Sequence, residues 1–511
     1  MTTTHSTTTL APTSARVGWR GWVALAVLML PVLLVSVDNT VLSFALPQIS
    51  LHLGPTSTQQ LWIIDIYPLV LAALLVTMGS LGDRFGRRRL LLIGATGFTA
   101  ISALAAFAPN AELLIAARAA MGFFGAMLMP STLSLVRSIF TDRDQRRMAI
   151  AVWAAGFSAG AALGPIVGGL LLEHFGWGSV FLLAVPVLVP MLVLAPLFVP
   201  ESRDPAPGRI DPVSILLSLA AMLPVVYAIK HAAVAGLDIA VVAGLLVGFG
   251  AGALFVRRQR RSASPMLDMD LFRRGGFSGA IVVNLLSVVG LVGFLYFVSQ
   301  HLQLIVGLSP VQAGLALLPG LVAMITAGLV VVPISRRVPP RVLVPAALVA
   351  SVLGYVIVAL SADPEQLAPI VVAFMLLGVG IGMAEMVSNE LILSNAPVAK
   401  AGAASAVSET AYEFGAVLGT TVLGGILTAS YRNGIAVPEG IPAQLAASAR
   451  ETLAGAMNVA DQIGGAVGEA LRVAAAQAFD SGVTATALIG AGLIVVAGVV
   501  AAVTLREGDG Q

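Results

Sequence analysis

The feature that most constrains this chain is a long series of apolar runs, each about as long as a membrane span, separated by short charged or Gly/Pro-containing breaks. A helix needs about 20 apolar residues to cross the hydrocarbon core of a bilayer, which is roughly 30 Å thick. Of the 511 residues, 58% are hydrophobic and 11% are charged, whereas an ordinary soluble domain is roughly 25% charged. The pattern predicts an all-α polytopic membrane protein with little chain left for a soluble domain.

Fourteen of these runs are predicted to span the membrane. Two of them stand between two sets of six, which gives a 6+2+6 arrangement of the kind that transporter duplication produces. A faint repeat supports two homologous halves, because the charged break Gly79–Arg89 has a degraded counterpart in Arg336–Arg341. The predicted spans are 21–47, 60–80, 90–109, 112–136, 147–172, 178–199, 213–231, 236–256, 277–302, 311–333, 342–361, 367–394, 402–430 and 483–505.

These spans divide the chain into parts. The predicted parts are a Thr-rich, disordered N-terminus (1–15), an N-terminal six-helix bundle (16–205), two inserted helices (206–262) and a C-terminal six-helix bundle (263–511). The last part includes an Ala-rich loop, 431–482, in which the Pro442 start and the Gly464–Gly465 break predict a hairpin of two short amphipathic helices on the periplasmic face. Two interpretations of this loop stay open, a solvated connector and a lid that shapes the outer exit.

The basic residues predict the orientation. Most Lys and Arg residues fall in alternate breaks, so the positive-inside rule predicts that both termini are cytoplasmic and that the chain is a multi-pass protein of the bacterial inner membrane. This topology explains the small net charge of +2, and no nucleic-acid partner is expected. The chain has no cysteine and no GxxxxGK[ST] phosphate loop, so we expect neither a metal nor a cofactor, and an ion gradient supplies the energy.

Three ionisable residues interrupt the predicted spans of the N-terminal bundle. Asp38, Asp65 and Arg118 lie roughly 13, 9 and 9 Å from the outer ends of their helices, at a rise of about 1.5 Å per residue. Because a charge in lipid costs several kcal/mol unless it faces a partner or a water-filled cavity, we expect the three to meet in one outer-half cavity. A carboxylate there binds either a proton or a cation, so the sequence predicts a site for proton coupling and cation binding. The alternative is that each residue only bonds to neighbouring helices.

Acidic residues also fall in the twelfth and thirteenth predicted spans. Glu409 and Glu413 are four residues apart and share a helix face. Glu413 lies roughly 18 Å from the predicted inner end of its helix, near mid-bilayer, where it suits a contact with a substrate cation or a second protonation site. Glu385 is a weaker candidate for substrate binding, and Glu390 lies near an inner end, where the alternative is a structural pair with a loop arginine.

The fifth span carries glycines at every fourth position and a proline. The run Gly156-x3-Gly160-x3-Gly164-Pro165-x2-Gly168-Gly169 permits close approach of another helix, and Pro165 permits a bend. We therefore expect Gly164, Pro165, Gly168 and Gly169 to form a pivot for alternating access, with ordinary small-residue packing as the alternative. The same segment matches the GxSxG pattern of a catalytic serine, but it is a continuous apolar helix without a partner histidine, so an enzyme is not expected.

Four motifs together resemble the major facilitator superfamily and, within it, the fourteen-span drug:proton antiporters. They are Val37-Asp38-Asn39-Thr40-Val41, the loop Gly79–Arg89, Arg118-x3-Gly122 and Gly164-Pro165-x2-Gly168-Gly169. The resemblance implies a monomeric transporter that exports lipophilic cations, such as quaternary ammonium compounds, ethidium-like and acriflavine-like dyes and fluoroquinolones, in exchange for protons. An exporter of a natural metabolite, an amino acid or a lipid-like molecule, stays open as the alternative on the same scaffold.

The resemblance also implies roles for single residues. Trp62-Ile-Ile-Asp65-Ile-Tyr67 and Ser408-Glu409-Thr410-Ala411-Tyr412-Glu413 are similar to segments of these exporters, which adds Trp62, Tyr67 and Tyr412 to the expected substrate site. The likeness at Gly79–Arg89 implies an inner gate that contains Gly79, Asp83, Arg84, Gly86 and Arg87. Some relatives carry a further acid in the tenth span, whereas 311–333 contains none, so divalent substrates are not expected.

Overall fold

The computed structural model describes residues 17–204, 211–262, 265, 267, 269–361, 366–395 and 401–505. Every regular element in these ranges is a helix, which confirms the predicted all-α fold. Thirteen spans of this part of the chain are long and apolar enough to cross a membrane, and a helix bent by 42° between its segments Asp144–Ala161 and Leu163–Phe175 makes the predicted fourteenth. The N-terminal stretch 1–15 lies outside the described residues.

The first seven helices form the N-terminal group and follow the first six predicted spans, the sixth of which is divided between α6 and α7. They are α1 (Trp19–Leu53), α2 (Ser57–Phe85), α3 (Arg87–Ala105), α4 (Ala111–Ile139), α5 (Arg143–Phe175), α6 (Ser179–Leu182) and α7 (Ala184–Phe198). Within this group α1 packs on α5, α2 on α4, and α3 on α4 and α7.

The later elements begin with a helical pair and continue with the C-terminal group. The pair is α8 (Pro212–Ala235) and α9 (Ile239–Arg261); the group is η1 (Leu271–Arg273), α10 (Gly275–Gln300), η2 (His301–Ile305), α11 (Pro310–Ser335), α12 (Pro340–Leu360), α13 (Leu367–Ser394), α14 (Ala401–Leu418), η4 (Gly419–Gly424), α15 (Gly425–Gly434), α16 (Ala443–Glu451), α17 (Leu453–Ile463) and α18 (Gly465–Thr504). The elements η2 and η4 are π-helical turns within their spans.

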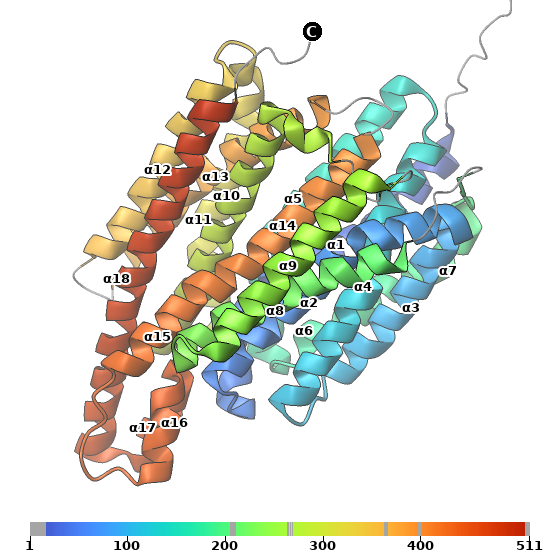
Figure 1. Cartoon of the computed structure of the whole chain (residues 1–511). Coiled ribbons are helices and arrows are strands. Elements are labelled where there is room, and N and C mark those ends of the chain that lie inside the picture. Colours follow the sequence, from blue (N-terminus) through green and yellow to red (C-terminus); the bar gives the residue numbers. More distant parts are fainter. Residues whose placement is uncertain are drawn as a thin grey trace, which may run out of the picture.

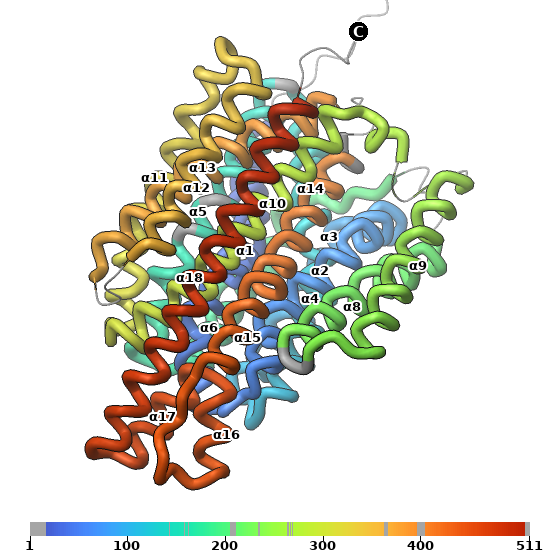
Figure 2. Tube along the Cα trace, turned by 60° about the vertical axis from the view of Figure 1, so that its left-hand side comes forward, coloured from blue at the N-terminus to red at the C-terminus, as the bar shows by residue number. Residues whose placement is uncertain are grey.

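The two groups lie side by side, with blue helices in one and yellow to red helices in the other (Figure 1). Across the boundary, α2 packs on α14 and α5 packs on α11. The green pair α8–α9 lies outside both groups, where α8 packs on α2 and α15 (Figure 2). This arrangement agrees with two bundles and an inserted pair, although the residue numbers predicted for the divisions stay a prediction.

The molecule has two opposite ends, the α17 end and the arginine end. The α17 end carries α16, α17 and the connection between α1 and α2, at the bottom of Figure 1. The arginine end carries the end of α2 with Arg84, the start of α3 with Arg87–Arg89, and the end of α9. Each span runs from one end to the other.

The predicted loop 431–482 differs in extent from the observed elements. A helix does begin after Pro442, and a break does occur at Gly464, which has a φ of 62°. However, the segment after that break is no separate hairpin helix, because α18 runs without interruption for 40 residues from Gly465 to Thr504. Its first half is rich in Ala, the strongest helix former, and contains no proline, so the helix continues into the apolar half. The two short helices are α16 and α17, which meet at Thr452.

Small side chains and one ion pair hold the α8–α9 pair together. Gly244 and Gly248 lie against the backbone of α8, so that an added Cβ would come within about 3 Å of the carbonyl oxygens of Pro224 and Ala221. At the arginine end, Arg258 forms two hydrogen bonds to the carboxylate of Asp211, of 2.7 and 2.9 Å. The hydrogen bond from Arg258 holds the pKa of the Asp211 carboxyl below its usual range.

Candidate functional site

A small cavity lies in the middle of the molecule, between α1, α2, α4 and α5 of one group and α10, α11, α13 and α14 of the other. Asp38, Asp65 and Arg118 all line it, and so do Glu385 and Tyr412 of the opposite group. Its volume is about 70 Å³, which is room for about two water molecules at roughly 30 Å³ each. The structure therefore gathers four of the predicted ionisable residues, Asp38, Asp65, Arg118 and Glu385, around one space that is too small for a dye in this conformation.

Asp38 and Arg118 form a buried ion pair at this cavity. The distance from Asp38 Oδ2 to Arg118 Nη1 is 2.7 Å, and the Arg118 side chain is 1% exposed. Arg118 also donates from Nε to the carbonyl oxygen of Ile63 at 3.3 Å, and its guanidinium lies 4.5 Å from the centre of the Tyr67 ring. The structure brings Asp38, Arg118 and Tyr67 together, whereas their roles in coupling and binding stay predictions.

Asp65 has an ion-pair partner that the sequence did not suggest. Its Oδ2 lies 3.0 Å from Nζ of Lys230, on α8 of the inserted pair, and both side chains are buried. The same oxygen accepts a hydrogen bond of 2.7 Å from Thr421 in the π-helical turn η4. The ammonium group of Lys230 also lies 3.8 Å from the centre of the Trp62 ring. The predicted cluster of one arginine and two carboxylates is therefore two separate ion pairs.

Lys230 is a functional candidate that sequence reasoning missed. Its position near the end of a predicted span suggested a residue at the membrane surface, where lysine commonly lies. In the structure it is fully buried. The available signal was that an ionisable side chain inside an apolar run needs a partner, and Asp65 was an acid in the membrane without an assigned one of its own.

The candidate acidic residues of the C-terminal group differ in burial and in hydrogen bonding. Glu413 accepts a hydrogen bond of 3.1 Å from Asn39 of α1, next to Asp38. One carboxylate oxygen each of Glu385, Glu409 and Glu413 is buried without a hydrogen-bond partner among the described residues. Glu390 is exposed and lies outside the cavity. Tyr412 turns its ring edge-on to Phe157 of α5, with the ring centres 5.5 Å apart.

The glycine run of α5 packs against helices of both groups. An added Cβ at Gly160 would lie 2.9 Å from the carbonyl oxygen of Leu33 in α1, and one at Gly164 would overlap Thr40. On the other side, a Cβ at Gly169 would lie 2.8 Å from both Pro310 and Val311 of α11. Gly168, like Gly160 and Gly164, faces α1, where it lies against Val41. The predicted small-residue contact is confirmed, and its pivot role stays a prediction.

Pro165 lies at the same contact between the groups. A Cβ added to Gly314 of α11 would come within 2.6 Å of the Pro165 carbonyl oxygen. The oxygen of a residue in a bent helix is thus covered by the backbone of the neighbouring group. A side chain at Gly314 would block this close contact, so movement of the two groups along each other depends on glycine at this position.

The predicted inner gate lies at the arginine end and is held by hydrogen bonds. Asp83 pairs with Arg87 at 2.8 Å, and Gly86 has a φ of 115°, which favours glycine. Glu201, after α7, accepts hydrogen bonds from the backbone N–H groups of Arg88 and Arg89 at the start of α3. A carboxylate at a helix N-terminus is stabilised in this way.

Two members of the predicted gate are less constrained. The nearest atom to a Cβ added at Gly79 is 3.5 Å away, in Pro130, which is an ordinary contact. Arg84 lies over the ring of Phe85 at 5.9 Å. The gating roles of Gly79, Asp83, Arg84, Gly86 and Arg87 stay predictions.

Hydrogen bonds join the two groups at the α17 end, and no sequence pattern predicted them. Glu451 of α16 accepts from both the backbone and the hydroxyl of Ser57 on α2, and it pairs with Arg432 at 3.1 Å. Asn458 of α17 donates to the carbonyl oxygen of Leu51 at 3.2 Å. The α17 end is therefore closed in this conformation.

Two helical groups around a central cavity, with paired ions buried inside the membrane-spanning helices, define a secondary transporter rather than an enzyme. The chain belongs to the Major Facilitator Superfamily, whose model matches residues 28–420. It is a multi-pass protein of the bacterial inner membrane.

Individual relatives support this family over nearly the whole chain. The sequence is 56% identical over 496 residues to the multidrug efflux pump LfrA of Mycolicibacterium smegmatis, covering 97% of this chain and 98% of that protein. It is 36% identical over 462 residues to the methyl viologen resistance protein SmvA of Salmonella typhimurium, covering 90% and 93%. Among solved structures, an inward-facing bacterial homologue of the human lysosomal transporter Spinster matches with a TM-score of 0.67 at 16% identity, covering 94% of this chain and 98% of that one. The last likeness supports the fold alone.

Proposed function

We propose that this chain is a proton-coupled antiporter that exports lipophilic cations, including quaternary ammonium compounds, ethidium-like and acriflavine-like dyes and fluoroquinolones. The observation that carries the proposal is the ring of buried ionisable groups around one cavity, in which Asp38 and Asp65 each contact an internal cation. The likeness to proteins named for multidrug efflux and drug resistance supports the substrate class. The proposal needs no cofactor, and it assigns no nucleic-acid partner and no partner subunit.

The mechanism rests on competition at the carboxylates. A proton on Asp38 removes the negative charge that holds Arg118 at 2.7 Å, so the ion pair is weakened and α1 is free to move against α4. On the opposite wall, a cation that enters the cavity supplies the positive charge that Glu385 lacks, and Glu413 lies just behind the lining residue Asn39, to which it is hydrogen-bonded. Since the anionic form of a buried carboxyl without a partner is costly, each of these groups takes either a proton or the cargo. Export and proton entry are then alternate states of one site.

Alternating access follows from the closed end and the close helix contacts. The cavity is far smaller than a dye, so the two groups must separate for cargo to enter. The contact of α5 with α11 at Gly169 is the proposed pivot. The arginine end is proposed to face the cytoplasm, since its loops hold most of the basic residues. Breakage of the hydrogen bonds at the α17 end would then release cargo outward.

Reconstituted vesicles test this function. Purified protein in liposomes with an imposed pH difference should move ethidium against its gradient, and a protonophore should stop the movement. Asp38→Asn should remove pH-driven transport while the protein remains folded in the membrane. Transport that ignores the pH difference in the wild-type protein would contradict the proposal.

A second candidate is export of a natural product by the same scaffold. The observation in its favour is the 34% identity over 415 residues to the tetracenomycin C resistance and export protein of Streptomyces glaucescens. The same vesicles can be loaded with tetracenomycin C, with amino acids or with a lipid-like molecule in place of dyes. Proton-dependent movement of one of these, with none of the lipophilic cations, would favour this candidate.

A further inference from the structure

The inserted pair α8–α9 supplies a buried cation to the central site. Lys230 is 0% exposed, although lysine is rarely buried without a partner. Its ammonium group contacts a carboxylate oxygen of Asp65 on one side and the face of the Trp62 ring on the other. A carboxylate together with an aromatic face is the chemistry that binds organic cations. The surroundings of the Lys230 ammonium group therefore have the composition of a cation-binding subsite.

The carboxylate at this subsite connects three parts of the molecule. Asp65 belongs to α2 of the N-terminal group, Lys230 to the inserted pair, and Thr421 to the π-helical turn η4 of the C-terminal group. The other carboxylate oxygen of Asp65 is buried without a hydrogen-bond partner among the described residues. A second ligand for this carboxylate, a cation or a proton, thus has a free acceptor facing it.

We propose that Lys230 is a tethered occupant of a cation subsite formed by Trp62 and Asp65, and that cargo displaces its ammonium group when it binds. This inference rests on the proposed function. It explains why an inserted helix, which contributes no residue to the cavity lining, places a buried ammonium group against the lining residue Asp65. Lys230 then sets a threshold of affinity, because only a cargo cation that contacts both Trp62 and Asp65 better than the lysine does can enter.

The threshold can be measured as binding at equilibrium. Tetraphenylphosphonium, a lipophilic monovalent cation, is titrated into purified protein in lipid nanodiscs at a single pH. If Lys230 occupies the subsite about nine-tenths of the time, its removal tightens apparent binding about tenfold. Lys230→Met keeps the length of the stem without the charge, and Lys230→Gln adds an amide that can still donate to Asp65. Both should bind the probe more tightly than the wild-type protein, and Lys230→Arg should not.

The Asp65→Asn background separates this role from a structural one. A lysine that only supports the fold would, when removed, weaken binding or leave it unchanged. The proposed occupant instead predicts a gain that disappears when Lys230→Met is combined with Asp65→Asn. Equal or weaker binding in folded Lys230→Met and Lys230→Gln proteins would overturn the inference. Failure of the proposed function would be visible separately, as wild-type transport that does not respond to a pH difference.

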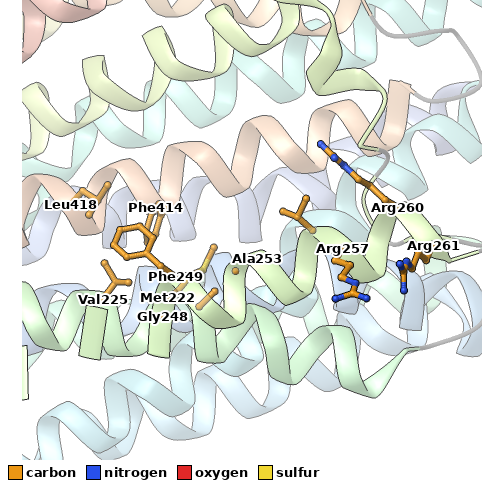
Figure 3. Close-up of a pocket in the computed structure, with 13 residues that line it drawn as sticks. Met222, Val225, Gly248, Phe249, Ala253, Arg257, Arg260, Arg261, Phe414 and Leu418 are labelled. Carbon is orange, nitrogen blue, oxygen red and sulfur yellow. The ribbon is translucent and has the colours of Figure 1, made fainter. Parts of the chain in front are cut away.

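A second inference comes from a different place, a groove on the outer surface between α8, α9 and α14. The groove has a volume of about 800 Å³. Its floor and walls are apolar and include Met222, Val225, Phe249, Phe414 and Leu418, as Figure 3 shows. Along α9 it runs from Gly248 to Arg261, roughly 20 Å at 1.5 Å per residue. That length exceeds half of a hydrocarbon core of about 30 Å, so one acyl chain of a single leaflet fits along it.

The end of the groove carries unpaired positive charge. Arg257, Arg260 and Arg261 line it at the arginine end (Figure 3). Their neighbour Arg258 is paired with Asp211, whereas none of these three has an ion-pair partner in the described part of the chain. Such a cluster repels a cationic drug and attracts a phosphate. The positive charge therefore favours an anionic amphiphile over a cationic one as the occupant of the apolar groove.

The geometry points to a binding site for one anionic phospholipid, with an acyl chain along α8, α9 and α14 and the phosphate among the three arginines. Such a lipid would fill the space between the inserted pair and α14, a helix that also carries Glu409 and Glu413. It would thereby support the position from which Lys230 reaches Asp65.

Native mass spectrometry of protein released from mixed phosphatidylglycerol and phosphatidylcholine nanodiscs tests the site. The wild-type protein should retain phosphatidylglycerol in preference, and Arg257→Gln with Arg260→Gln should lower that preference on the order of fivefold per arginine. Arg336→Gln with Arg337→Gln removes the same charge from the α11–α12 connection and is the matched control. Ala253→Phe fills the groove and keeps every arginine, so it should also displace the lipid. Equal losses in the two arginine pairs, with no loss in Ala253→Phe, would mean general surface attraction and would overturn the site.

Discussion

Asp38 and Arg118 are 80 residues apart in the chain, yet their side chains meet at 2.7 Å in the interior of the N-terminal group. Arg118 has further contacts with the Ile63 carbonyl oxygen and the Tyr67 ring, both of α2. One guanidinium group thus holds α1, α2 and α4 together. Loss of the charge on Asp38 would affect all three helices at once.

Replacement of Asp38 by Asn should abolish pH-driven export, since an amide carries no exchangeable negative charge. It also leaves Arg118 buried without its counter-ion, which typically destabilises a protein by about 3–5 kcal/mol. The double variant Asp38→Asn with Arg118→Gln should regain thermal stability but not transport. Ethidium movement in vesicles and thermal unfolding in detergent measure the two effects, and coupled transport by Asp38→Asn would contradict the assignment.

Replacement of Glu413 by Gln should reduce the export of monovalent cationic dyes about tenfold, because interactions with charged groups are commonly worth about 1.5–3 kcal/mol. The amide oxygen can still accept from Asn39, so the fold should persist. Zwitterionic fluoroquinolones should lose less, since part of their charge is balanced internally. Glu390→Gln, at an exposed position, is the control. Unchanged efflux of every dye would remove Glu413 from the site.

Replacement of Gly169 by Ala should impair transport strongly, because the added methyl group would meet backbone atoms of Pro310 and Val311 that cannot turn aside. Overpacking of this kind typically costs about 1–3 kcal/mol. Gly492→Ala on α18 is the matched control, because an added Cβ there has no neighbouring atom within 4 Å, and it should transport nearly as the wild-type protein does. Transport rates per molecule of folded protein measure the difference. Similar rates in the two variants would argue against a pivot at α5.

Replacement of Glu451 by Gln should favour opening at the α17 end, because the carboxylate joins Ser57 of one group to Arg432 of the other. The chain has no cysteine, so spin labels can be placed directly through Phe107→Cys and Val473→Cys, which are exposed positions on the two groups. In Glu451→Gln, the fraction of molecules with a long distance between the two spin labels should rise relative to the wild-type protein. Arg472→Gln breaks an ion pair with Asp461 inside the C-terminal group and should leave the distances unchanged.

Much of the architecture was accessible from the sequence, because apolar length alone specifies a membrane span. The rise per residue also places Asp38, Asp65 and Arg118 at similar depths, and the structure puts all three around one cavity. Depth along a helix says nothing about which neighbour a side chain faces. For that reason the ion-pair partner of Asp65 was missed, since Lys230 reaches it from a helix that the sequence marks only as an insertion.

Other features depend on helix geometry that composition does not encode. The π-helical turn η4 places Thr421 against Asp65 within a run that reads as one continuous helix. The start of α18 was predicted at residue 483, where hydropathy rises, whereas the helix begins at Gly465. Helix formation and membrane burial are separate properties, and the sequence pattern reported only the second.

The length of α18 has a mechanical consequence. Its 40 residues extend roughly 60 Å, about twice the thickness of the hydrocarbon core. Since Gly468 of α18 lies against Ala460 of α17, and α16 packs on α17, the half of α18 that begins at Gly465 is a lever arm with α16 and α17 at its tip. A tilt of about 10° inside the bilayer would displace a tip about 30 Å away by roughly 5 Å. A small tilt of α18 inside the bilayer is thus amplified into a larger sideways displacement of α16 and α17. That displacement occurs where Asn458 donates a hydrogen bond to the carbonyl oxygen of Leu51.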